Sequence, residues 1–194
     1  MSTAEAPALV RVHEGREIPA SGTYLIDTSH SSAEFVVRHL GLSKVRGRFT
    51  RFSGDIQIAD TPEESSVEVD IDVDSVDTSE SNRDNHLRSP DFFHVEEHPS
   101  MSFKSTSVTP VDDETWEVGG LLSIRGVTRP VVLHTVFEGG DNTPFGDQRV
   151  GFSATTEINR EDWDLGWNAV MESGGFVVGK KVKIELNVEA IRQA

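Results

Sequence analysis

Alternation of apolar and polar residues dominates the chain from Tyr24 to its C-terminal end. Residues 67–74 alternate valine or isoleucine with glutamate or aspartate, and residues 182–189 alternate apolar residues with lysine, glutamate and asparagine. A period of two sends successive side chains to opposite faces of an extended strand, so each segment predicts a β-strand with one dry face. Shorter alternating segments lie at 33–39, 45–49, 56–58, 101–103, 118–124, 131–137 and 150–158. Turn residues separate these roughly nine or ten candidates.

Few segments of the chain show a pattern that predicts a helix. Ser79–Leu87 is the best helix candidate, with Thr78 or Ser79 as its N-terminal cap, and a second short turn is expected at Arg160–Leu165. Many strands with short connections predict an all-β fold, either an antiparallel barrel or a sandwich. An eight-stranded barrel can be filled by side chains or can hold one small ligand, and the pattern leaves both open.

The chain length of 194 residues suits one domain. We expect that domain over residues 22–194, preceded by a polar, flexible tail over residues 1–21. Cysteine is absent, which excludes thiol catalysis, disulfides and cysteine-ligated metal sites.

The net charge limits the classes of binding partner that we expect. Lys and Arg number 18 against 33 Asp and Glu, a formal charge of −15. This balance argues against nucleic-acid binding and against electrostatic docking on an anionic membrane. No apolar stretch approaches the roughly 18 residues that cross a bilayer, and residues 1–21 lack a signal-peptide pattern. We therefore expect a cytoplasmic protein with no stable membrane insertion.

A series of short motifs runs from Tyr24 to Ala190. The motifs are YLIDTSHS at 24–31, FVVRH at 35–39, VRGRF at 45–49, DSVDT at 74–78, NRD at 82–84, SPDFF at 89–93, IRGVT at 124–128 and INR at 158–160. In this order and spacing they resemble the YceI-like family, also called the polyisoprenoid-binding protein family. One segment departs from the family pattern: Asp162-Trp163-Asp164 stands where the family has Asp-Phe-Gly, and we expect a changed turn there.

The resemblance implies an extended antiparallel β-barrel of lipocalin-like shape, with one or two short helices and a long apolar pore. It also implies non-enzymatic binding of a long-chain amphiphile: a polyisoprenoid, an isoprenoid quinone or a fatty acid derivative. Sequestration, storage or transport of that lipid is the expected role. No cofactor is expected. Relatives are often dimers, which leaves a homodimer open.

Under this expectation, large apolar residues line the pore. The candidates are Phe35, Val37, Phe49, Phe103, Leu121, Ile124, Phe152 and Trp167. The alternative is that the same side chains fill a closed core.

Two polar residues are candidates for contact with a ligand head group. Arg83 suits an anionic head because guanidinium matches phosphate geometry, but an Arg83–Asp84 ion pair that fixes the helix is the alternative. His39 shares a face with Phe35 and Val37 if the alternation holds. It then bonds a ligand head or a backbone carbonyl. In the alternative function, an isomerase or cyclase-like enzyme in a similar barrel, His39 serves as general base.

His94 and His98 are four residues apart, a spacing that suits metal ligation on a helix. Pro99 argues against a helix there, and no third ligand follows at motif spacing. A polar loop is favoured, and no metal site is predicted. The acidic row at 68–74 is interpreted as a solvated strand face.

Overall fold

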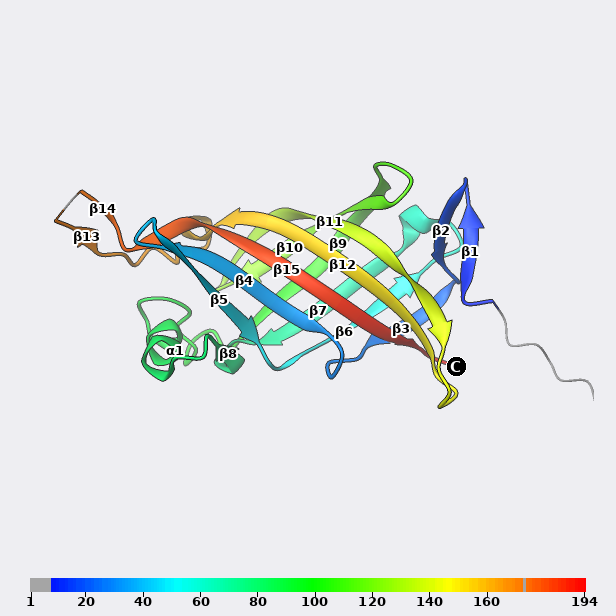
Figure 1. Cartoon of the computed structure of the whole chain (residues 1–194), viewed down its shortest axis with the longest axis horizontal. Helices are drawn as coiled ribbons and strands as arrows, with labels where there is room; N and C mark the ends of the chain where they lie inside the picture. Colours follow the sequence, from blue (N-terminus) through cyan, green and yellow to red (C-terminus); the bar gives the residue numbers. More distant parts are fainter. Residues whose placement is uncertain (1–7, 173) are drawn as a thin grey trace, which may run out of the picture.

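The computed structural model of the chain describes residues 8–172 and 174–194, and it consists mainly of β-strands (Figure 1). The strands are β1 (Val10–His13), β2 (Arg16–Pro19), β3 (Gly22–Ile26), β4 (Ser32–His39), β5 (Ser43–Phe49), β6 (Phe52–Ile58), β7 (Ser66–Asp72), β8 (Val76–Asp77), β9 (Ser100–Pro110), β10 (Thr115–Ile124), β11 (Val127–Asn142), β12 (Gln148–Asn159), β13 (Val170–Met171), β14 (Gly175–Phe176) and β15 (Val178–Arg192). The helical elements are α1 (Ser81–Arg88) and three 3₁₀ turns, η1 (Pro62–Glu64), η2 (Val73–Ser75) and η3 (Arg160–Trp163).

The large sheet closes into an eight-stranded antiparallel barrel. β3 and β4 both pair antiparallel with β15, so they are successive lengths of one barrel strand. In the same way β5 continues into β6, and β7 continues through η2 into β8. The ring then runs through β9, β10, β11 and β12, and β12 pairs with β15 to close it. The predicted all-β, extended antiparallel barrel is confirmed.

Serine hydroxyls form hydrogen bonds with the backbone where two of the barrel strands are broken. At the break between β3 and β4, Ser31 Oγ accepts from Glu189 N at 2.9 Å and donates to Glu189 O at 3.1 Å. At the break between β5 and β6, Arg51 N donates to Ser75 Oγ at 3.0 Å. Backbone groups that have lost their ladder partners are thereby satisfied, as burial requires.

Two glycines allow large rings to lie against the inner wall. A Cβ atom on Gly47 would stand 2.3 Å from the Phe35 ring, and one on Gly120 would stand 2.4 Å from the Phe103 ring. Both distances are far below contact distance, so only glycine fits opposite these rings.

The N-terminal segment differs from its prediction. The polar composition of residues 1–21 predicts a flexible tail, but β1 and β2 form an antiparallel hairpin. Ile18 is buried, and Arg11 donates to the carbonyls of Ala59 and Asp60 at 2.7 and 2.8 Å. Two short strands with few apolar residues give little periodic signal, which explains the error. Residues 1–7 of the predicted tail lie outside the described residues.

Helix α1 begins later than predicted. Its N-cap is Glu80, whose carboxylate accepts from Arg83 N at 2.6 Å and Asn82 N at 3.2 Å. Neither predicted cap, Thr78 or Ser79, is the N-cap, and the Thr78 hydroxyl instead bonds the side chains of Arg83 and Asp84. Across the described residues, no helix has the length and apolar character needed to cross a membrane.

An ion-pair network joins β15 to β4 and β5. Arg46 Nη1 donates to Glu185 at 2.6 Å and to Glu34 at 2.7 Å, and thereby offsets the repulsion of two carboxylates that face each other across strands. Lys183 adds a contact to Glu185 at 2.8 Å. Hydrogen bonds from Lys183 and Arg46 lower the pKa of Glu185 from 4.5 to about 2.

Glu185→Gln tests this network. A depressed pKa in the folded state contributes stability that is complete above pH 4.5 and is lost as the pH falls toward 2. We therefore expect the variant to melt a few degrees lower at pH 7 and to lose less stability between those two pH values. Melting temperature against pH is the measurement, with Glu63→Gln at an exposed position as control. Parallel curves for Glu185→Gln and the wild type would contradict the network.

Candidate functional site

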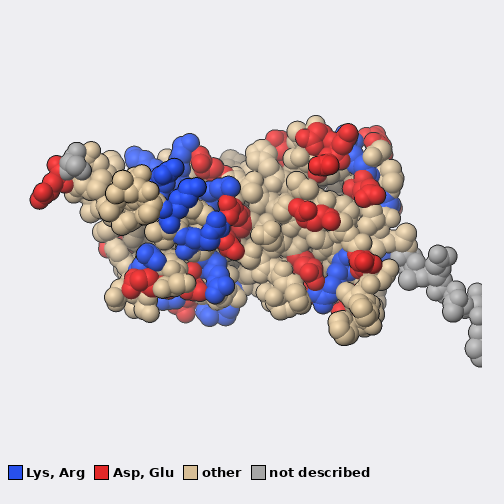
Figure 2. Space-filling model, in the orientation of Figure 1, with Lys and Arg blue, Asp and Glu red and all other residues tan. Residues whose placement is uncertain are grey.

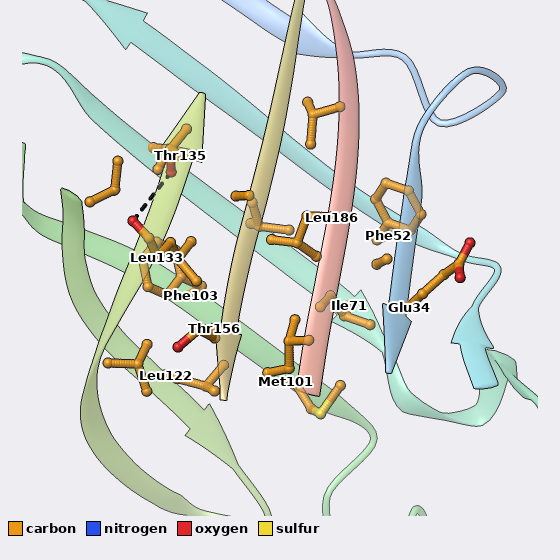
Figure 3. Close-up of a pocket in the computed structure, with 18 of the residues that line it drawn as sticks. Glu34, Phe52, Ile71, Met101, Phe103, Leu122, Leu133, Thr135, Thr156 and Leu186 are labelled. Carbon is orange, nitrogen blue, oxygen red and sulfur yellow. Dashed lines mark hydrogen bonds between the residues drawn. The ribbon is translucent and has the colours of Figure 1, made fainter. Parts of the chain in front are cut away.

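The barrel is hollow. A cavity of about 330 Å³ lies inside it, within the size range of small-molecule sites. Its lining runs from Ile18 and Pro19 at the β1–β2 end to Phe92 and Phe93 at the α1 end, so it extends along the barrel. Figure 3 shows Met101, Phe103 and Leu186 turned into this space from β9 and β15. Polar groups are few, and one of them, Thr135 Oγ1, donates to Leu133 O at 3.3 Å.

Six of the predicted lining residues face the cavity. They are Phe35, Val37, Phe49, Phe103, Ile124 and Phe152. Three of them stand on β4 and β5, and the others stand on β9, β10 and β12. Their contact with a ligand stays a prediction.

Leu121 does not line the pore, contrary to the prediction. It is 43% exposed and points outward, while Leu122 and Ile124 line the cavity. Residues three apart cannot share a face of a regular strand, so Leu121 and Ile124 are incompatible as a lining pair. Gly120, Leu122 and Ile124 are the inward set of β10.

A second, smaller pocket of about 200 Å³ lies at the α1 end of the barrel and is called the mouth pocket below. It shares Phe35, Val37, Leu87, Phe92 and Val178 with the main cavity, so the two are neighbours along one wall. Three predicted residues lie here and not in the main cavity: His39, Arg83 and Trp167. Trp167 is therefore a mouth residue, which corrects its expected place in the pore.

Arg83 is fixed by the loop that precedes α1. Its Nε donates to Thr78 Oγ1 at 2.7 Å and its Nη2 to Thr78 O at 2.9 Å. Asp84 accepts from the backbone N and the hydroxyl of the same threonine at 2.8 and 2.6 Å. The alternative of an Arg83–Asp84 ion pair is wrong for the described residues, since both side chains bond Thr78 instead.

Two histidines border the mouth pocket in different ways. The His86 ring packs edge-on against Trp167 at 4.6 Å between centroids, and its Nε2 lies 2.8 Å from Asp91 Oδ2. The His39 ring makes no hydrogen bond or ion pair within the described residues. A general-base histidine is normally oriented by a second group, and His39 lacks one here.

Arg160 is a site residue that sequence reasoning did not single out. Its side chain is buried, and it donates to four carbonyls of the segment that carries Trp167: Leu165, Trp167, Val178 and Gly179. Burial lowers its pKa from the ordinary value. The only available signal was its position in the INR motif at 158–160. Arg160 therefore holds the mouth segment in place.

The structure shows how Asp162-Trp163-Asp164, which departs from the family pattern, is accommodated. Trp163 is 2% exposed, and its Nε1 donates to Leu122 O at 3.0 Å. Asp164 takes the left-handed conformation, with φ 58°, and its carbonyl accepts from Arg125 at 3.1 Å. Aspartate is among the residues that tolerate this conformation without a glycine.

One group of side chains near the α1 end has metal-ligand spacing. The ligand atoms of His94, Glu97 and His98 lie within 4.8 Å of one another. A single turn brings the histidines together, with His98 N donating to His94 O at 2.9 Å. The prediction of no metal site stays a prediction.

A second group, Asp27, His30 and Glu189, is already bridged by a cation. Arg149 Nη1 donates to Asp27 at 2.6 Å and also to Glu189. Hydrogen bonds from Ser29 and His30, with a further one from Arg149, hold the pKa of Asp27 well below its ordinary range. This group is best described as an ion-pair cluster.

Comparisons with known proteins agree with this geometry. A family model described as a YceI-like domain matches residues 24–190. A UPF0312 protein of Shewanella denitrificans is 41% identical over 175 residues, which cover 88% of this chain and 87% of that protein. A solved YceI protein of Campylobacter jejuni is 29% identical, covers 81% of this chain and 90% of its own, and superposes with a TM-score of 0.68. A polyisoprenoid-binding domain from Saccharophagus degradans has the same TM-score at 16% identity, over 90% of this chain and all of that one, which shows the shared fold.

Arg160→Met tests the role of the buried guanidinium. Removing its donors leaves buried carbonyls unpaired, and we expect the free energy of unfolding to fall by about 2–4 kcal/mol. Urea denaturation measures this change. Arg160→Lys, which keeps the charge but loses the planar fork, should give an intermediate loss. A Met variant as stable as the wild type would show that the carbonyls find other partners.

Proposed function

Since the chain belongs to the YceI-like family, we propose that its barrel binds one long-chain amphiphile and holds it for sequestration, storage or transport, without chemical change. The observation that carries the proposal is the apolar cavity of about 330 Å³ along the barrel, next to a mouth pocket with cationic and aromatic residues. The proposed ligand is a polyisoprenoid, an isoprenoid quinone or a fatty acid derivative.

Burial of the ligand's hydrocarbon chain supplies the affinity. Each methylene removed from water contributes about 0.8 kcal/mol, so ten methylenes supply on the order of 8 kcal/mol before the cost of immobilising the ligand. A dry wall is enough for this interaction, and no directional bond is needed along the pore. Selectivity for the length of the lipid then depends on how far the cavity extends.

The head group is expected in the mouth pocket. Arg83 has two of its nitrogens engaged by Thr78, which fixes the guanidinium beside the pocket at little further entropic cost. Arg38 and His39 border the same pocket from β4. These donors favour an anionic or hydrogen-bond-accepting head.

Binding is favoured over the isomerase or cyclase alternative. A base in an enzyme needs a tuned environment and an oriented proton acceptor. Among the described residues, the neighbours of His39 in the mouth pocket are apolar side chains, two arginines, Thr78 and His86, and they include no carboxylate. This environment suits ligand contact better than proton abstraction.

A pair of tryptophan substitutions tests the proposal. Ala154 is buried on the cavity wall, so Ala154→Trp should fill the tube and weaken binding of a fluorescent fatty acid or prenyl probe at least about tenfold. Leu121→Trp adds the same ring on the outer face and should leave the affinity unchanged. Circular dichroism and melting temperature establish that both variants fold.

The natural ligand is sought by mass spectrometry of an organic extract of the purified protein. An extract without any amphiphile, together with no saturable uptake of either probe, would contradict the proposal. Equal affinity of the two tryptophan variants would place the probe outside the barrel and would count against it as well.

A further inference from the structure

Positive charge is concentrated on the β4, β5 and β15 side of the mouth end, whereas the α1 side, residues 74–98, carries seven acidic residues against two arginines. Residues 38–48 contain four Lys and Arg and no acidic residue, and residues 165–183 contain three lysines and one acid, Glu172. These two segments together carry seven cations against one acid, whereas the whole chain has a net charge of −15. Figure 2 shows Lys and Arg gathered over the end where β4, β5 and the start of β15 lie, with Asp and Glu prominent over the other half.

The two segments are neighbours around the mouth pocket. Leu40 N donates to Val177 O at 2.8 Å, and His39 pairs with Val178 across the sheet. Arg38, His39 and Val45 from the first segment and Trp167, Val177 and Val178 from the second all line the pocket. The cationic surface therefore borders the mouth pocket on the side formed by β4, β5 and the start of β15.

Large apolar side chains project from the same end. Leu42, at the turn between β4 and β5, is 83% exposed. Val170 and Phe176, on β13 and β14, are 76% and 53% exposed, and Figure 1 shows this hairpin extending beyond the barrel. The ammonium of Lys180 lies 6.0 Å from the centre of the Phe176 ring. Apolar tips flanked by Lys and Arg are the pattern of a protein surface that enters a lipid headgroup region.

Two of the cations are free to meet an external anion. Arg46, Arg48 and Lys180 have carboxylate partners within the protein: Glu34 and Glu185 for Arg46, Asp77 for Arg48 and Glu161 for Lys180. Arg38 and Lys44 are exposed and, in the described part of the chain, have no acidic partner within ion-pairing distance. Both lie on the β4–β5 hairpin that carries Leu42.

We propose that the mouth end docks on an anionic lipid bilayer. Leu42, Val170 and Phe176 enter the headgroup layer, and Arg38 and Lys44 contact lipid phosphates. The net negative charge of the chain predicts the opposite, but charges beyond a Debye length of about 8 Å are largely screened at physiological salt, so the local surface decides. The passage of lipid cargo through the docked mouth rests on the proposed function, whereas the docking itself does not.

Vesicle flotation tests the docking. The wild type should float with phosphatidylcholine vesicles that contain phosphatidylglycerol, less with pure phosphatidylcholine, and less again at high salt. Lys44→Glu should weaken binding to the anionic vesicles about tenfold. Lys104→Glu makes the same charge change on the exposed side of β9 and should have little effect.

Replacing exposed apolar residues by serine distinguishes the insertion of apolar side chains from the attraction between charges. Leu42→Ser with Phe176→Ser should weaken vesicle binding about tenfold or more. Val12→Ser with Val111→Ser is the matched control, since both valines are exposed at the β1–β2 end. Uptake of a soluble fluorescent fatty acid should stay unchanged in the mouth double variant, which distinguishes a docking defect from a loss of lipid binding.

Absence of wild-type binding to anionic vesicles would overturn the proposal. Equal loss in the mouth variants and their controls would overturn it too, since attachment would then be unspecific. Retained vesicle binding in both mouth variants would overturn it as well, since another face would then carry the attachment.

Discussion

Closure of the sheet around β15 is the constraint on which the hollow interior depends. β15 pairs with β12 along one edge and with β3 and β4 along the other, so every barrel strand has two neighbours. A ring without edges satisfies its backbone hydrogen bonds in the wall, and the interior needs no polar groups for that purpose. The serines at the breaks extend this satisfaction to places where the strands bend. The cavity can be apolar because the backbone N–H and C=O groups of the wall find their hydrogen-bond partners within the wall.

The period of two predicted most of this wall from the sequence. The segment 182–189 sends Val182, Ile184, Leu186 and Val188 into the cavity, as the alternation requires. Errors arose where alternation carries little information. Leu121 follows two glycines, which have no side chain to mark a face, and a shift of register between Gly119 and Gly120 breaks the count there. The β1–β2 hairpin is too short and too polar for a periodic signal.

The mouth was less predictable because long-range backbone contacts build it. Arg160 acts through carbonyls, and no residue type in the segment 165–179 marks its carbonyl as a partner. Arg83 and Asp84 both hydrogen-bond to Thr78. Their opposite charges and adjacent positions predict instead an ion pair between the two. Neighbouring residues on a helix point in different directions, so sequence adjacency is poor evidence for an ion pair. Trp167 reaches the mouth because the segment after η3 leaves the wall and returns at β15.

The distribution of charge follows from the same division between wall and mouth. Acidic side chains on the outer faces of strands, such as Glu68 and Asp70 on β7, face water and discourage association between barrels. A uniformly acidic surface would also repel anionic lipid from the mouth pocket, and the cations at 38–48 reduce that repulsion on the β4–β5 side. The net charge of the whole chain therefore does not determine the encounter with a ligand or a surface, which depends on the charges within a Debye length of the contact. A barrel of this charge pattern can stay apart from its own copies and still approach an anionic surface by one end.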